Sequence, residues 1–75
     1  MNKQRRTAIG EIYSRLKDIR LDLGNLQSEE QKAYDNIPEG LLGTETAENS
    51  EEAIDRMDDA LECIDEAVEH LDEIM

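Results

Sequence analysis

Carboxylates are the most numerous side chains of this sequence that could carry out chemistry. Twenty Asp and Glu residues occur among 75, against eight Lys and Arg, so the net charge is −12. The single cysteine, Cys63, and the single histidine, His70, are the other groups suited to act as a nucleophile, a base or a metal ligand. The spacing of these residues decides which chemistry they permit.

A metal site is the first chemistry to weigh. A di-metal site in a helical bundle takes inward-facing Glu-x-x-His motifs, but the residue three positions before His70 is Ala67. An EF-hand places oxygen ligands around a central glycine, whereas the acidic stretch after Thr44 has a helical period and contains no glycine. The pattern therefore favours a solvated acidic face, and we expect no metal or other cofactor.

Cys63 and His70 are too far apart for a catalytic pair. They lie seven residues apart, about 10 Å along a helix axis, and the neighbouring carboxylates disfavour a thiolate. We expect both to be surface residues without chemistry; a metal site spanning a dimer, or a contact with a partner, is the alternative. The sequence also lacks a phosphate-binding glycine loop, a nucleophile elbow and zinc-ligand spacing, so we do not expect an enzyme.

A heptad repeat from Ala47 to Met75 positions most of the acidic side chains. In the notation abcdefg, apolar residues dominate columns a and d, alanine dominates column g, and columns b, e and f are acidic throughout. This pattern predicts a helix over about 45–74, capped by Thr44. The helix would carry an apolar seam on one side and an acidic face on the other.

The first half of the chain contains a second apolar seam with the same alternating spacing of three and four. It predicts a helix over about 7–35, with Thr7 as a cap and with polar Glu30 interrupting the seam near its end. Away from the seam, Leu21 and Gly24 are either tolerated surface residues or the point where a partner approaches closely.

The connection over residues 36–44 ends the first helix. Pro38 disfavours helical geometry at Ile37, and Gly40 and Gly43 can adopt left-handed conformations. A connection this short makes the helices antiparallel neighbours. We therefore predict a single all-α domain over 1–75, an antiparallel two-helix coiled-coil hairpin.

One register of the hairpin matches every strongly apolar layer. It opposes Leu16 to Ile64 and brings polar Glu30 to Ser50. A register shifted by one heptad ranks second, because it sets Glu30 against Met57. The predicted helix-pairing seam consists of Ile9, Ile12, Leu16, Ile19, Leu23 and Leu26 on the first helix and Ile54, Met57, Leu61, Ile64, Val68 and Leu71 on the second.

Two helices alone leave one side of each seam in water. The alanine column of the second helix, Ala53, Ala60 and Ala67, permits a close neighbour. A core of this size also supplies only about 3–5 kcal/mol, which favours further burial. We therefore expect a homodimer that forms a four-helix bundle.

Charge is distributed unevenly along the chain. Residues 1–32 carry seven Lys and Arg against five Asp and Glu, whereas residues 33–75 carry one Arg against fifteen Asp and Glu. An acidic field repels nucleic acids and anionic membranes and attracts basic surfaces. We therefore expect a protein partner, with no direct nucleic acid, membrane or small-molecule substrate. The lack of a long apolar run and the lone cysteine predict a cytoplasmic location.

The acidic columns form rows about 40 Å long. Such rows either keep a small bundle soluble or occupy a basic groove that otherwise binds a nucleic-acid backbone. We therefore predict a non-enzymatic protein-interaction module, with a purely structural homo-oligomer as the alternative. The candidate partner-binding residues are Asp55, Asp58, Asp59, Glu62, Asp65, Glu66, Glu69, Asp72 and Glu73.

The stretch AYDNIPEGLLGTE, followed by acidic heptads, resembles small uncharacterised acidic two-helix proteins of bacteriophages and mobile elements, in which a D-N-x-P-E-x-L-x-G-[ST] connection joins the helices. The resemblance covers about residues 33–75. It implies an accessory protein that inhibits a host factor in the host cytoplasm, and it assigns no catalytic or binding residue to this chain.

Overall fold

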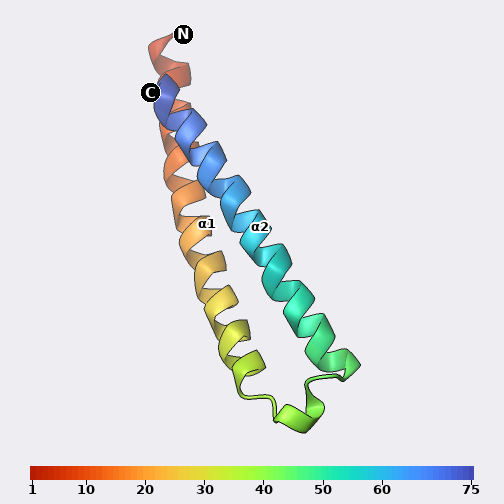
Figure 1. Cartoon of the computed structure of the whole chain (residues 1–75). Coiled ribbons are helices and arrows are strands. Elements are labelled where there is room, and N and C mark those ends of the chain that lie inside the picture. Colours follow the sequence, from red (N-terminus) through yellow and green to blue (C-terminus); the bar gives the residue numbers. More distant parts are fainter.

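Two long α-helices packed side by side make up the computed structural model, which describes all 75 residues (Figure 1). Helix α1 spans Lys3–Asp35, helix α2 spans Glu45–Ile74, and a short 3₁₀-helix, η1, spans Glu39–Leu41 between them. The molecule is a rod of 59 × 14 × 14 Å, with both termini at one end. The predicted all-α fold of two helices in contact is confirmed.

Helix α1 begins before the predicted cap at Thr7. The Asn2 side chain accepts a hydrogen bond from the Arg5 backbone N–H at 2.7 Å and so caps the helix. Asn is a stronger N-cap residue than Thr, so the helix continues back through Arg6 and Arg5 to Lys3. The prediction that Thr7 caps α1 was therefore wrong.

The connection reverses the chain without a left-handed residue. Neither Gly40 nor Gly43 has a positive φ. Helix α1 ends at Asp35. Pro38, with φ −57° and ψ 142°, has no N–H to continue the helical hydrogen bonds and disfavours helical geometry at the residue before it, Ile37. Helix α2 starts where the Thr44 hydroxyl accepts a hydrogen bond from the Ala47 N–H at 3.4 Å. The bounds and the cap of α2 are those that the heptads predicted.

The core is a narrow strip between the helices. Only Ala47, Ile54 and Leu61 are buried, and all three belong to column a of α2. The α2 residues that flank them in the predicted seam are half-buried: Met57, Ile64, Val68 and Leu71. Helix α2 therefore turns its predicted seam toward α1.

Helix α1 turns a different face toward its neighbour from the predicted one. In the heptad frame of α1, Ile9, Leu16, Leu23 and Glu30 form column a, and these residues are half-buried as expected. Three residues of column d, Ile12, Ile19 and Leu26, are instead exposed at 44%, 52% and 57%. Long side chains of column e take their place: Tyr13, Arg20, Gln27 and Tyr34, all half-buried. Three of these side chains reach acidic residues of α2, and α1 is rotated accordingly. The assignment of Ile12, Ile19 and Leu26 to the seam between the helices was therefore wrong.

The axial register agrees with the predicted one. The Ser50 hydroxyl donates a hydrogen bond to the Glu30 carboxylate across the helix pair. A shift by one heptad would replace Ser50 with Met57, which cannot make this bond. The half-buried Glu30 therefore has a polar partner in the seam in only one of the two registers, and we call Glu30 and Ser50 the polar layer.

Candidate partner-binding surfaces

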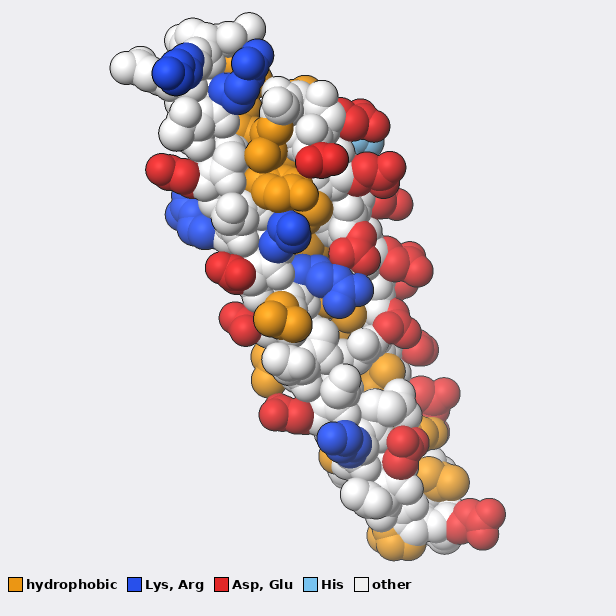
Figure 2. Space-filling model, turned by 90° about the vertical axis from the view of Figure 1, so that its left-hand side faces the viewer, with side chains coloured by type: hydrophobic (Ala, Val, Ile, Leu, Met, Phe, Trp, Pro, Cys, Tyr) orange, Lys and Arg blue, Asp and Glu red, His pale blue; other side chains and the backbone are white.

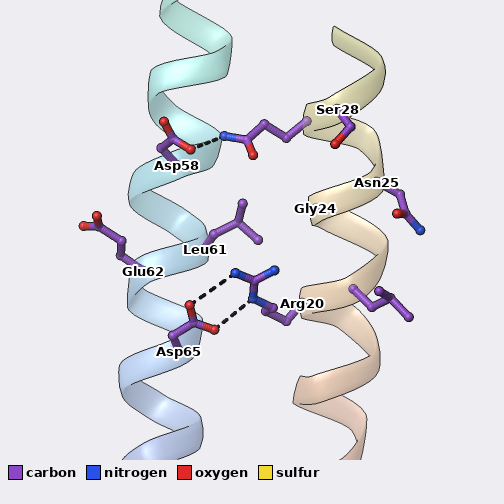
Figure 3. A pocket seen from close by; sticks show the side chains of 10 residues that line it. Arg20, Gly24, Asn25, Ser28, Asp58, Leu61, Glu62 and Asp65 are labelled. Atoms are coloured by element: carbon purple, nitrogen blue, oxygen red, sulfur yellow. Dashed lines mark hydrogen bonds and ion pairs between the residues drawn. The ribbon is translucent and has the colours of Figure 1, made fainter. Parts of the chain in front are cut away.

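One long side of the hairpin, termed the closed side, is bridged by polar side chains from column e of both helices. Arg20 Nε donates a hydrogen bond to Asp65 Oδ1 at 2.9 Å, and one heptad nearer the turn Gln27 donates to Asp58 (Figure 3). A third bridge follows near the turn, at 3.5 Å. The three bridges are Arg20–Asp65, Gln27–Asp58 and Tyr34–Glu51.

Arg20 and Asp65 form the only salt bridge of the structure. The hydrogen bond from Arg20 lowers the pKa of the Asp65 carboxyl, and the same bond raises the pKa of Arg20. The stability linked to Asp65 is therefore present above the ordinary carboxyl pKa of about 4 and is lost as the pH falls through the lowered value. Both side chains are about half exposed, so solvent screens the pair and it mainly selects the orientation of the helices.

A shallow groove of about 360 Å³ lies beside two of these bridges. In Figure 3, Leu61 points between the helices, whereas Asn25 and Glu62 point outward. The Arg20 guanidinium and the Asp65 carboxylate in the groove already bind one another. No group of three or more His, Cys, Asp or Glu residues is arranged to hold a metal ion.

Gly24 lines this groove together with Leu21, which is 62% exposed. A Cβ built on Gly24 would stand 3.4 Å from Arg20 Nη1, the far end of a flexible side chain. Because glycine costs about 1 kcal/mol relative to alanine inside a helix, Gly24→Ala should raise the free energy of unfolding by about 0.5–1 kcal/mol. Urea unfolding followed by circular dichroism measures this change.

Gly10→Ala is the matched control for that substitution. Its Cβ would lie at an ordinary contact distance of 3.8 Å from Met75 Cε. If Gly10→Ala stabilised the protein and Gly24→Ala destabilised it, Gly24 would be required for the path of the Arg20 side chain.

The nine carboxylates predicted to bind a partner are all exposed. Asp58 and Asp65 take part in bridges of the closed side, and Asp72 continues their column. The other six follow each other at spacings of four and three residues on the outward surface of α2, where no hydrogen bond or ion pair within the chain engages them. Figure 2 shows acidic side chains along this edge of the rod. We name these six the acidic row: Asp55, Asp59, Glu62, Glu66, Glu69 and Glu73.

The density of negative charge on α2 is close to that of a nucleic-acid strand. The nine carboxylates from Asp55 to Glu73 extend over about 27 Å at 1.5 Å per residue. This amounts to one charge per about 3 Å, compared with one phosphate per roughly 3.4 Å along one strand of B-DNA. Arg56 is the only Lys or Arg residue of α2.

The opposite long side, termed the open side, has no salt bridge across it, and the polar contact between the helices there is the Glu30–Ser50 hydrogen bond at the turn end. Because the e columns meet on the closed side, helical geometry places column d of α1 and column g of α2 on the open side. A hollow of about 410 Å³ at its turn end supports this placement, since Ala33 of α1 and Thr46 of α2 line it together. The open side consists of Ile12, Ile19, Leu26, Ala33, Ala53, Ala60 and Ala67.

Cys63 and His70 lie on the outer margin of the open side, in column c of α2. Both are exposed, and Cys63 is a free thiol.

Neither helix combines the length and the apolar character that crossing a membrane requires. Comparisons with protein-family models, with curated proteins and with solved structures give no match to this chain.

Proposed function

We propose that this protein is a non-enzymatic interaction module whose acidic row binds the basic, nucleic-acid-binding surface of another protein. The observation that carries the proposal is that the acidic row has no counter-charge within the chain. A surface that serves solubility alone needs only interspersed charges of both signs. Helix α2 instead carries thirteen Asp and Glu residues with one Arg.

The rigidity of the helix favours such a role. The carboxylates of the acidic row are held on one face of a long helix, with neighbours about 5–6 Å apart, so little ordering is required when they meet a row of cations. Their summed field steers a basic partner toward the rod and accelerates encounter. Because exposed charges are screened over about 8 Å at physiological ionic strength, the complex should weaken as salt increases.

The partner class follows from charge density and from the resemblance of residues 33–75 to acidic two-helix proteins of bacteriophages and mobile elements. The charge density supports a partner that binds nucleic acid, and the resemblance supports a host factor in the host cytoplasm. The module would inhibit such a protein by occupying the groove that otherwise holds the phosphate backbone.

A pair of variants with equal net charge tests the proposal. The first changes four residues of the acidic row, as Asp55→Asn, Asp59→Asn, Glu62→Gln and Glu66→Gln. The control changes four exposed carboxylates of α1, as Glu11→Gln, Asp18→Asn, Asp22→Asn and Glu29→Gln. Each immobilised protein is incubated with host lysate at low and at high salt, and bound proteins are identified by mass spectrometry.

The wild type should retain a basic nucleic-acid-binding protein at low salt only, and added duplex DNA should release it. The acidic-row variant should bind that protein at least tenfold more weakly, which corresponds to about 1.4 kcal/mol, while the α1 variant keeps its affinity. Equal losses in both variants, with helix content unchanged by circular dichroism, would mean that overall charge and not the acidic row attracts the partner.

A purely structural homo-oligomer is the second candidate function. The open side favours it, because its large apolar side chains, Ile12, Ile19 and Leu26, are about half exposed. The same pull-down separates the two candidates: a protein that only self-assembles would retain no host protein at any salt concentration.

A further inference from the structure

We propose that the open side binds a second copy of this chain, about a two-fold axis parallel to the rod, so that α1 of each copy packs against α2 of the other. The contact would be separate from the acidic row, and its failure would leave the proposed binding of a basic partner unaffected.

The open side presents large apolar side chains that the hairpin itself does not cover. Ile12, Ile19 and Leu26 are spaced seven residues apart and form a stripe about 21 Å long. The neighbouring α2 column offers methyl side chains at Ala53, Ala60 and Ala67, of which the first two are exposed, and ends with the 47%-exposed Ile74 near Ile12. The result is a ridge of branched side chains beside a shallow strip that can receive a similar ridge.

Charge selects a second copy as the occupant of this side. Two copies of a chain with a net charge of −12 repel each other. This repulsion is smallest where the facing surfaces carry equal numbers of positive and negative side chains. The charged columns that border the open side hold two Arg and two acidic residues, with neutral residues between them. These charged residues are Arg15, Asp22 and Glu29 of α1 and Arg56 of α2.

The rod is large enough for a dimer interface of standard size if the contact extends along its whole length. A face of 59 × 14 Å corresponds to at most roughly 800 Å² on each copy and about 1,600 Å² in total, which is the standard size of a specific protein–protein interface. A rod-shaped hairpin can bury this area without changing its backbone.

The direction of the two-fold axis follows from the charges of the two helices. An axis perpendicular to the rod would stack α2 on the second copy's α2, bringing two strongly acidic helices together. An axis parallel to the rod stacks α1 on α2 instead. Residues 1–32 carry a small excess of cations, whereas α2 has thirteen acidic residues and one Arg, so the parallel axis pairs unlike charges at both contacts.

The parallel axis also matches large side chains to small ones. Arg20 binds Asp65, so the adjacent Ile19 lies at about the height of residue 66, beside Ala67. A two-fold axis along the rod preserves heights, so Ile19 of one copy meets Ala67 of the other. Leu26, next to Gln27, meets Ala60 in the same way, because Gln27 binds Asp58. Each of these large side chains is therefore placed against an alanine.

Sedimentation velocity between about 1 and 500 µM, a range that covers typical micromolar affinities, tests the dimer. The wild type should be a dimer, and its Tm should rise with protein concentration, because only the folded state associates. Ile19→Glu should weaken association at least 100-fold. The control Leu21→Glu places the same charge on an exposed residue of α1 outside the open side and should leave the dimer intact.

A wild type that stays monomeric throughout this range, with a Tm independent of concentration, overturns the proposal. Equal weakening by Ile19→Glu and Leu21→Glu would also overturn it, because charge and not position would then control association. If Ile19→Glu fails to fold, the concentration dependence of the wild-type Tm decides between the dimer and the monomer.

A distance measurement tests the direction of the axis. A spin label is attached to Gly40→Cys in a Cys63→Ser background; Gly40 lies in the connection, where an added Cβ would have no neighbour within 4 Å. A parallel axis brings the two connections to the same end, within roughly 30 Å given helix spacings of 8–10 Å. A separation near the 59 Å length of the rod would overturn the parallel axis.

Discussion

Replacing Leu61 with alanine should remove most of the stability of the hairpin. Leu61 is 6% exposed and is one of only three buried residues. Truncating a buried leucine costs about 2–5 kcal/mol, while a core of this size supplies about 3–5 kcal/mol in total. We expect the Tm to fall by at least about 8 °C, measured by circular dichroism at 222 nm at one fixed protein concentration.

Leu21→Ala is the matched control, because it deletes the same atoms from a side chain that is largely exposed. Surface substitutions usually change stability by less than about 0.5 kcal/mol. Similar losses for the two variants would show that Leu61 does not belong to the core.

Replacing the polar layer by leucine should produce the second large effect, a gain in stability. Glu30 and Ser50 bind each other in the seam and line the hollow at the turn end of the open side. The double variant Glu30→Leu and Ser50→Leu would fill this hollow with apolar side chains. Since full burial of a leucine contributes about 1.5–3 kcal/mol, two half-buried ones should raise the free energy of unfolding by about 2–3 kcal/mol in urea titrations.

The two single variants should each give less than half of this gain. Each leaves one polar group of the pair without its partner, which offsets part of the apolar contribution. Additive single effects would indicate that the Glu30–Ser50 hydrogen bond does not couple the helices. The double variant should also lose specificity of register, because a polar pair in a seam opposes slippage of the helices.

The register and the bounds of α2 could be predicted because they depend on the spacing of apolar residues. Four heptads repeat the same columns, and only one alignment opposes Leu16 to Ile64 while joining Glu30 to Ser50. The exposure of the acidic columns follows from the same repeat. The sequence cannot decide whether those carboxylates have a partner, because solubility and binding require the same residue types.

The rotation of α1 could not be predicted from apolar spacing. Columns a and d of α1 are both apolar apart from Glu30, so periodicity alone gives no reason to expose Ile19 and turn Arg20 toward α2. The bridges to α2 decide between these faces. The sequence does contain a sign of these bridges, since column e of α1 consists of the hydrogen-bond donors Tyr, Arg, Gln and Tyr while column e of α2 is wholly acidic. Whether these donors reach the carboxylates depends on the distance between the helices, which the sequence does not give.

The bridges of the closed side have a further consequence, for the route by which the chain reaches its native state. They join residues 17, 31 and 45 positions apart, in order from the turn toward the termini. The Tyr34–Glu51 bridge closes the shortest loop. After it has formed, each later bridge requires only one more heptad of each helix to become ordered, so the entropic cost of each further loop closure is small. Such nested local contacts are typical of fast folding. We therefore expect the two helices to pair first at the turn, and their termini to be the last segments to gain protection against hydrogen exchange.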